Sequence, residues 1–80
     1  MTLGEGITKR IDELLYEKGW SLYKLSQESC IALSTLKNIY TGHTKCPALS
    51  VIYKLADAFK ISPIEFIDSK YLYPTNVLYD

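Results

Sequence analysis

The chain has 80 residues, nine basic and nine acidic side chains and therefore no net charge, and 48% of its residues are hydrophobic. This composition predicts one small globular domain and excludes a disordered chain. No apolar run approaches the roughly 20 residues needed to cross a bilayer, and the first ten residues lack the apolar core of a signal peptide. We therefore expect a cytoplasmic protein with no membrane segment.

The first predicted helix lies in the segment ITKRIDELLYEKGW. Its apolar residues Ile7, Ile11, Leu14 and Leu15 recur at helical spacing. Gly19 follows the last of the charged residues and is a typical C-terminal stop for a helix.

Two short helices are predicted next, with about three residues between them. Ser21 is a favourable N-cap for the segment LYKLSQES. The following helix runs from about residue 33 to residue 41, turns Leu36 and Ile39 inward, and ends at Gly42. Two short helices at this separation have the spacing of a helix-turn-helix unit.

Two further helices complete the predicted domain. Pro47 can open a helix in ALSVIYKLADAFK, and Ser62 and Glu65 form a predicted capping box for a fifth helix that runs to about residue 68. The apolar face of the fourth helix consists of Leu49, Ile52, Leu55, Ala56 and Phe59. Since residues 1–68 contain no strand pattern, the sequence predicts an all-α bundle of five short helices.

The sequence offers little for metal binding or catalysis. Cys30, Cys46 and His43 lack the paired spacing of a zinc site, and a cytosolic protein is not expected to form a disulfide. We expect reduced, partly buried thiols. With one histidine, no glycine-rich phosphate loop and no nucleophile–base pair, we expect neither an enzyme nor a bound cofactor or metal.

The charges are unevenly distributed. Residues 29–56 contain Lys37, Lys45 and Lys54 but no acidic residue. Zero net charge argues against strong nonspecific binding to nucleic acid, yet a locally positive segment suits one specific polyanionic site. The alternative, an ordinary solvated helix face, remains open on these grounds alone.

Residues 7–68 resemble the Cro/C1-type (XRE) helix-turn-helix family of phage repressors and bacterial regulators. The matching residues are Ile7, Arg10, Ile11 and Leu14, then Gly19, Ser21, Leu25 and Ser26, then Ile39 and Gly42, and finally the segment PALSVIYKLADAFKIS. The resemblance implies a five-helix bundle of the phage-repressor DNA-binding type over residues 1–68. Residues 69–80 would then form a C-terminal tail.

The same resemblance implies a sequence-specific transcriptional regulator, a repressor, that reads double-stranded DNA through the helix at residues 33–41. Base contacts would come from Leu33, Ser34, Lys37 and Asn38. Contacts to the DNA backbone would come from Ser21, Leu22, Tyr23, Thr41, His43, Thr44 and Lys45. The alternative is a protein-interaction module with weak or no DNA binding, in which Leu22 and Leu33 dock on a partner protein.

Four positions depart from the family pattern. Ser26 stands where the family usually has alanine, and Leu22 stands where it often has a polar contact residue. Cys30 stands where the family usually has glycine, at a turn expected to need positive φ. Tyr40 stands where the family commonly has a glutamate that pairs with an arginine of the first helix. We therefore expect Arg10 to meet Tyr40, by stacking or through the hydroxyl.

Family members read two half-sites about one helical turn apart, which predicts a homodimer. The expected interface lies on the fifth helix and the tail, and its residues are Ile64, Phe66, Ile67, Tyr71, Leu72 and Tyr73. The alternation in YLY allows a short paired strand there. The alternative is a tail that folds back over its own core.

Overall fold

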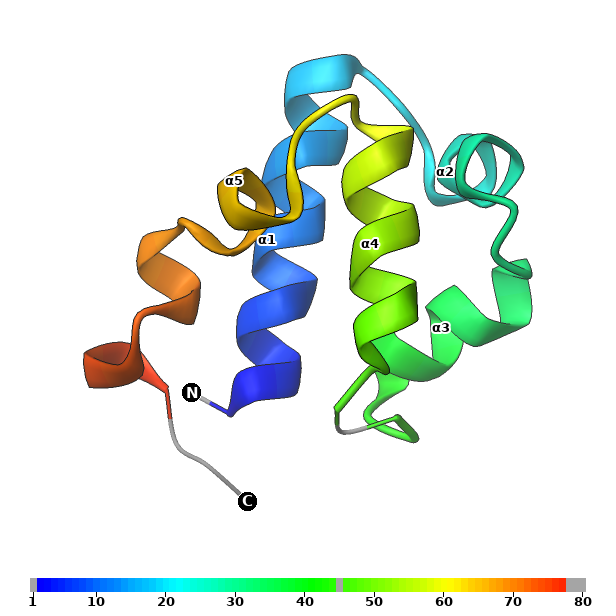
Figure 1. The fold of residues 1–80 in the computed structure, drawn as a ribbon. Coiled ribbons are helices and arrows are strands. Elements are labelled where there is room, and N and C mark those ends of the chain that lie inside the picture. Colours follow the sequence, from blue (N-terminus) through cyan, green and yellow to red (C-terminus); the bar gives the residue numbers. More distant parts are fainter. Residues whose placement is uncertain (1, 45, 78–80) are drawn as a thin grey trace.

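The computed structural model describes residues 2–44 and 46–77. It contains α1 (Leu3–Lys18), α2 (Leu22–Ser29), α3 (Leu33–Thr41), α4 (Leu49–Ala58) and α5 (Pro63–Ile67), followed by two short 3-10 helices, η1 (Lys70–Leu72) and η2 (Pro74–Asn76) (Figure 1). Within these described ranges there is no strand, so the predicted all-α fold is confirmed. No described helix is both long enough and apolar enough to cross a bilayer.

Helix α1 begins earlier than the apolar pattern indicated. Thr2 and Glu5 form a capping box, in which the Glu5 N–H donates to Thr2 Oγ1 over 3.2 Å and the Thr2 N–H donates to Glu5 Oε1 over 2.9 Å. The backbone hydrogen bond from Thr2 holds the pKa of the Glu5 carboxyl below its ordinary value. The cap starts the helix ahead of two glycines, and Gly19 ends it with φ of 68° as predicted.

The other helix starts follow the sequence in part. Ser21 caps α2, and the Ser62 hydroxyl accepts from the Glu65 N–H over 3.1 Å. Among the described hydrogen bonds, the reciprocal one from the Ser62 N–H to the Glu65 carboxylate is absent, so the predicted capping box is only half formed. Pro47 does not open α4, which begins two residues later at Leu49, while Pro47 itself is buried outside the helix.

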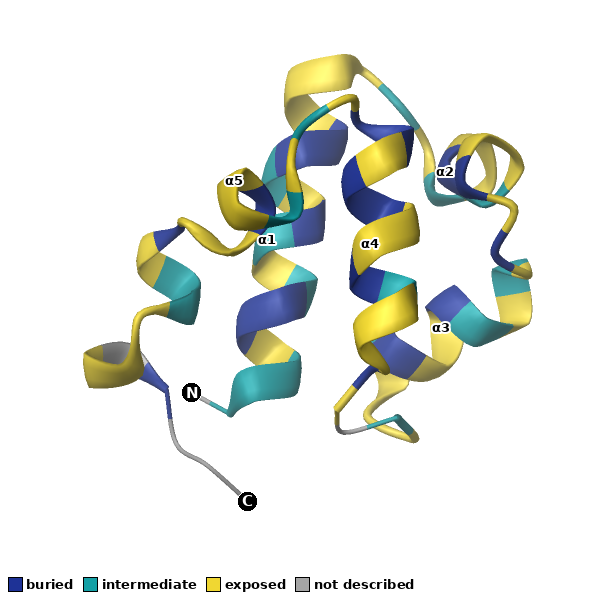
Figure 2. Cartoon of the chain, viewed as in Figure 1, coloured by how far each residue is buried: buried dark blue, intermediate teal, exposed yellow. Residues whose placement is uncertain are grey.

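All five helices contribute to one core, and their buried faces turn toward one another in Figure 2. The largest fully buried side chains are Ile11, Leu25, Leu36, Leu55, Phe59 and Phe66. Trp20 stacks on Phe59 with 5.5 Å between ring centroids. Leu49, predicted to face inward, is 70% exposed. Side chains lean toward the N-terminus of their helix, so the first residue of α4 points past its end.

The tail folds back onto α1, next to the N-terminus in Figure 1. A β-carbon at Gly6 would overlap the carbonyl oxygen of Tyr71, so only glycine permits this approach of η1. Leu72 packs against the core and Val77 is buried. Tyr71 and Leu72 of the YLY segment lie in the 3-10 helix η1, and not in the strand that the alternation of this segment suggested.

Candidate nucleic-acid interface

Helices α2 and α3 are joined by a tight turn. Cys30 ends α2 in the left-handed conformation, with φ of 59° and ψ of 26°, as the expected glycine position requires. The Ser29 hydroxyl accepts from the Ile31 N–H over 3.2 Å, and Ile31 is buried under the turn. Both Cys30 and Cys46 are exposed rather than partly buried. The described residues include no cluster of potential metal ligands.

Helix α3 has one buried and one exposed side. Leu36 and Ile39 are buried in the core, whereas Ser34, Lys37 and Asn38 are exposed. Leu33, the fourth predicted base-contact residue, is half-buried. Positions three and four apart on a helix share a face, so the fold brings these predicted residues together on one polar surface.

The loop after α3 is tied to the end of that helix. The Asn38 carbonyl accepts from the Thr44 N–H over 3.1 Å and from the Thr41 hydroxyl over 3.3 Å. Thr41 Oγ1 also lies 2.8 Å from His43 Nδ1. The side-chain amide of Asn38 makes no hydrogen bond with any described residue, so its donor and acceptor face solvent. The predicted contact residue Lys45 lies outside the described residues.

The N-terminus of α2 opens on the same unit. Ser21 Oγ accepts from the Lys24 N–H over 3.1 Å, and Tyr23 is exposed. Leu22 is half-buried and packs against the core, so only part of its side chain is exposed beside Tyr23. Its main-chain N–H has no acceptor in the described part of the chain and is available for the predicted backbone contact.

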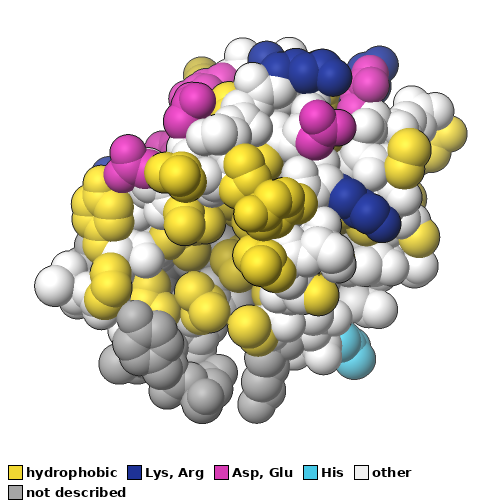
Figure 3. Space-filling view, in the orientation of Figure 1, with side chains coloured by type: hydrophobic (Ala, Val, Ile, Leu, Met, Phe, Trp, Pro, Cys, Tyr) yellow, Lys and Arg dark blue, Asp and Glu magenta, His cyan; other side chains and the backbone are white. Residues whose placement is uncertain are grey.

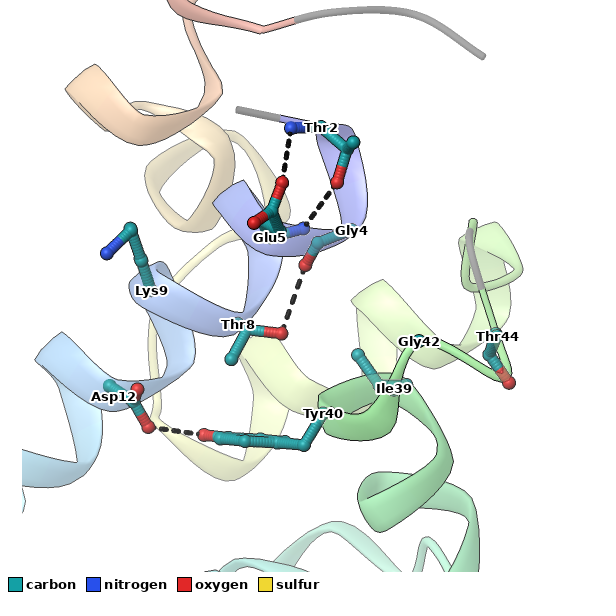
Figure 4. Close-up of a pocket in the computed structure, with 10 residues that line it drawn as sticks. All are labelled: Thr2, Gly4, Glu5, Thr8, Lys9, Asp12, Ile39, Tyr40, Gly42 and Thr44. Atoms are coloured by element: carbon teal, nitrogen blue, oxygen red, sulfur yellow. Dashed lines mark hydrogen bonds between the residues drawn. The ribbon is translucent and has the colours of Figure 1, made fainter.

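A cleft of about 580 Å³ separates α1 from the end of α3 and the following loop (Figure 4). Its lining residues are Thr2, Gly4, Glu5, Thr8, Lys9, Asp12, Ile39, Tyr40, Gly42 and Thr44. The Tyr40 hydroxyl donates to Asp12 Oδ1 over 2.6 Å and so links α3 to α1. Burial, and then this hydrogen bond and the carboxylate charge, raise the pKa of Tyr40 above its ordinary value.

The predicted contact between Arg10 and Tyr40 is wrong. Arg10 Nε donates to the Phe66 carbonyl and Nη2 donates to the Glu65 carbonyl, each over 2.8 Å, while Nη1 pairs with Glu13. At 100° per residue, positions 10 and 12 lie on nearly opposite sides of α1. Tyr40 therefore meets Asp12, and Arg10 reaches α5.

Cations are sparse on this surface. Lys37 is exposed on α3, and Lys24 on α2 pairs with Glu28 over 3.1 Å. No acidic side chain lies on α3, so nothing on that helix would repel a phosphate. The chemistry of the surface is therefore that of short neutral hydrogen-bonding groups with one free cation on α3.

A family model described as a Cro/C1-type HTH DNA-binding domain matches residues 10–70. The matched segment contains α2 to α5 and most of α1. No curated protein and no solved structure matches the chain significantly.

Proposed function

Since the chain belongs to the Cro/C1-type helix-turn-helix DNA-binding family, we propose that it is a transcriptional repressor that reads a specific double-stranded site. The observation that carries the proposal is the exposed polar face of α3, which stands beside a tight turn in a unit of this family. We infer that it is not an enzyme. A cytoplasmic location follows from the proposal, because a regulator shares the compartment of its DNA.

Base reading is assigned to the exposed face of α3. The free amide of Asn38 can form two hydrogen bonds with adenine, and Lys37 can donate to guanine or to a phosphate. Leu33 can pack on a thymine methyl group, and Ser34 can bond to several base edges. The exposure of Ser34, Lys37 and Asn38 supports these roles.

Contacts to phosphate are assigned to two flanking sites. The first site is the start of α2, where the positive end of the helix dipole attracts phosphate. Its assigned groups are Ser21, Tyr23 and the main-chain N–H of Leu22. At the end of α3 and in the loop that follows it, the assigned residues are Thr41, His43, Thr44 and Lys45. The Asn38 carbonyl accepts hydrogen bonds from the Thr41 hydroxyl and the Thr44 N–H, which holds these two residues against the end of α3 and supports their assignment to the DNA backbone.

We propose that the protein forms a homodimer through a surface that differs from the one predicted from the sequence. Phe66 has 0% exposure and cannot contact a second copy, and Tyr71 and Leu72 lie on the segment that packs against α1. Apolar side chains instead gather across the face of α4, α5 and the tail in Figure 3. The exposed large ones on these elements are Leu49, Tyr53, Ile64, Ile67 and Tyr73.

We also propose that residues 1–68 form the DNA-binding domain and residues 69–80 a tail.

A stable dimer buries roughly 800 Å² per partner. The described chain exposes 5067 Å² in total, so the apolar face would have to supply about a sixth of the surface.

The DNA proposal is tested by binding titrations at several salt concentrations, with a site selected from random DNA and a scrambled site. Asn38→Ala should weaken binding to the selected site by about 1–3 kcal/mol and relax preference at one base pair. Lys45→Ala should weaken both DNAs equally and reduce the salt slope by about one unit per protomer, or about two units for the dimer. Lys18→Ala removes an exposed lysine from the last turn of α1, outside the assigned contact residues, and serves as the control.

Two results would overturn parts of this proposal. Equal weakening of both DNAs by Asn38→Ala would remove its base-reading role. If no DNA is selected, and a protein partner whose binding is insensitive to salt is lost in Ser34 or Lys37 variants, the protein-interaction module replaces the repressor.

The dimer is tested separately by analytical ultracentrifugation. Ile64 is 76% exposed, so Ile64→Glu should leave the monomer folded and abolish association. Tyr16 on α1 is 90% exposed and lies outside the apolar face, so Tyr16→Glu is a matched control. A wild-type protein that stays monomeric at high concentration, with and without DNA, would disprove the homodimer.

A further inference from the structure

Helix α5 is too short to be stable without contacts to the rest of the domain. It has five residues, and isolated helices below about 12 residues are not stable in water. Phe66 anchors its inner side in the core, and the Ser62 hydroxyl caps its first turn. Its outer side presents Ile64 and Ile67, which are central to the proposed dimer surface.

The C-terminal end of α5 is completed by a residue from the other end of the chain. The last four carbonyls of a helix have no acceptor role within it and need other donors. Here Ile64 and Ile67 are served by the N–H groups of Asp68 and Ser69, and Glu65 and Phe66 by the guanidinium of Arg10. One side chain of α1 therefore satisfies two of the four.

The arginine is itself held in place. Its side chain is only 13% exposed, and Glu13, one turn along α1, pairs with the nitrogen that α5 leaves free. A planar guanidinium with parallel donors fixes both distance and direction, which a single ammonium cannot do. Arg10 thus sets how α5 lies against α1.

Helix α3 is attached to α1 by a different contact. The Tyr40 hydroxyl donates to Asp12, on nearly the opposite side of α1 from Arg10. The two working surfaces, α3 and the outer side of α5, are therefore held to one helix by two separate polar contacts. A change in one contact should leave the other intact.

We propose that Arg10 is a positioning residue for homodimer formation, acting through the carbonyls of Glu65 and Phe66 to orient Ile64 and Ile67. The inference rests on the proposed homodimer. It predicts that loss of Arg10 weakens association while each protomer still binds a half-site through α3.

The test compares Arg10→Met and Arg10→Lys with Lys9→Met, which removes an exposed cation from the neighbouring position of α1. Ultracentrifugation should show the dimer dissociation constant of Arg10→Met raised by about tenfold or more, the scale of losing a hydrogen bond from a charged donor. Arg10→Lys should also weaken association, because it keeps the charge without the two parallel donors. Lys9→Met should match the wild type.

Hydrogen exchange, measured at a dilution at which wild type and variant are both monomeric, supplies a second readout that does not depend on association. The amides of Phe66 and Asp68, which bond to Ser62 and Ile64, should exchange faster in Arg10→Met. The amide of Ile39 in α3 should keep its protection, which excludes global unfolding. Binding of Arg10→Met to a DNA half-site should stay within about twofold of wild type.

Each contrary outcome has its own meaning. Unchanged protection of the α5 amides, or unchanged association in Arg10→Met, would overturn the positioning role. Wild-type behaviour of Arg10→Lys would show that charge alone suffices, and would overturn the role of the carbonyl contacts. A monomeric wild type would instead disprove the proposed homodimer, and with it the link from Arg10 to association.

Discussion

Replacement of Cys30 by glycine should stabilise the protein. Cys30 occupies the left-handed region with φ of 59°, which is unfavourable by about 1–2 kcal/mol for a residue with a β-carbon. Glycine adopts this conformation without strain, but its greater backbone freedom stabilises the unfolded chain by about 0.4–1 kcal/mol. The Cys30 side chain is exposed, so its removal sacrifices little packing. At the midpoints of these two ranges, the net gain in the free energy of unfolding is about 0.8 kcal/mol.

For a domain of this size that gain corresponds to a rise in Tm of roughly 3–6 °C. Thermal unfolding followed by circular dichroism, under reducing conditions, measures it. Cys46→Gly is the matched control, since Cys46 is also exposed but does not have positive φ. The control should be neutral or slightly destabilised. If Cys30→Gly lowers Tm, or if both variants shift it equally, the backbone reasoning is refuted.

Three other changes probe contacts within the protomer. Gly6→Ala should push the Tyr71 carbonyl, and with it η1, away from α1 and expose the tail to limited proteolysis; unaltered resistance would contradict this. Tyr40→Phe should cost about 1 kcal/mol in denaturant unfolding by removing the bond to Asp12. Because the pKa of Tyr40 is higher in the folded than in the unfolded state, the wild type should lose stability as the pH rises above about 10, where the unfolded chain ionises. Tyr40→Phe should lose less stability over the same pH range. Phe66→Ala should cost about 3–5 kcal/mol, close to the whole stability of a small domain, as urea titration would show.

Signals confined to a few neighbouring residues predicted the helices well. Ser21 and Ser62 mark helix starts, and Gly19 and Gly42 mark helix ends, because capping chemistry acts within one turn. The positive φ at Cys30 also follows from its place in the turn. The same reasoning placed α2 and α3 at the observed residues, and hence the polar surface of α3.

Contacts between distant segments could not be predicted in this way. Arg10 meets carbonyls 55 and 56 residues away, and a main-chain acceptor leaves no mark in the sequence. The bond from Tyr40 to Asp12 spans 28 residues and depends on which side of α1 faces α3. The packing of the tail against α1 requires a close approach of the Tyr71 carbonyl to Gly6. Nothing in the neighbouring sequence indicates why a glycine stands at this position.

The sparse charge of the proposed DNA surface makes association central to its affinity. If Lys37 and Lys45 are the cations that each protomer places on phosphate, a dimer neutralises about four, and log K should fall with log salt at a slope of about −3 to −4. A single protomer, with half that slope, would hold DNA weakly. Joining two half-sites makes the second binding event intramolecular and multiplies affinity without adding charge. In the proposed dimer, recognition by Asn38 on α3 would therefore depend on association through α5, and loss of Arg10 should weaken binding to the full DNA site even though Arg10 lies outside the proposed DNA surface.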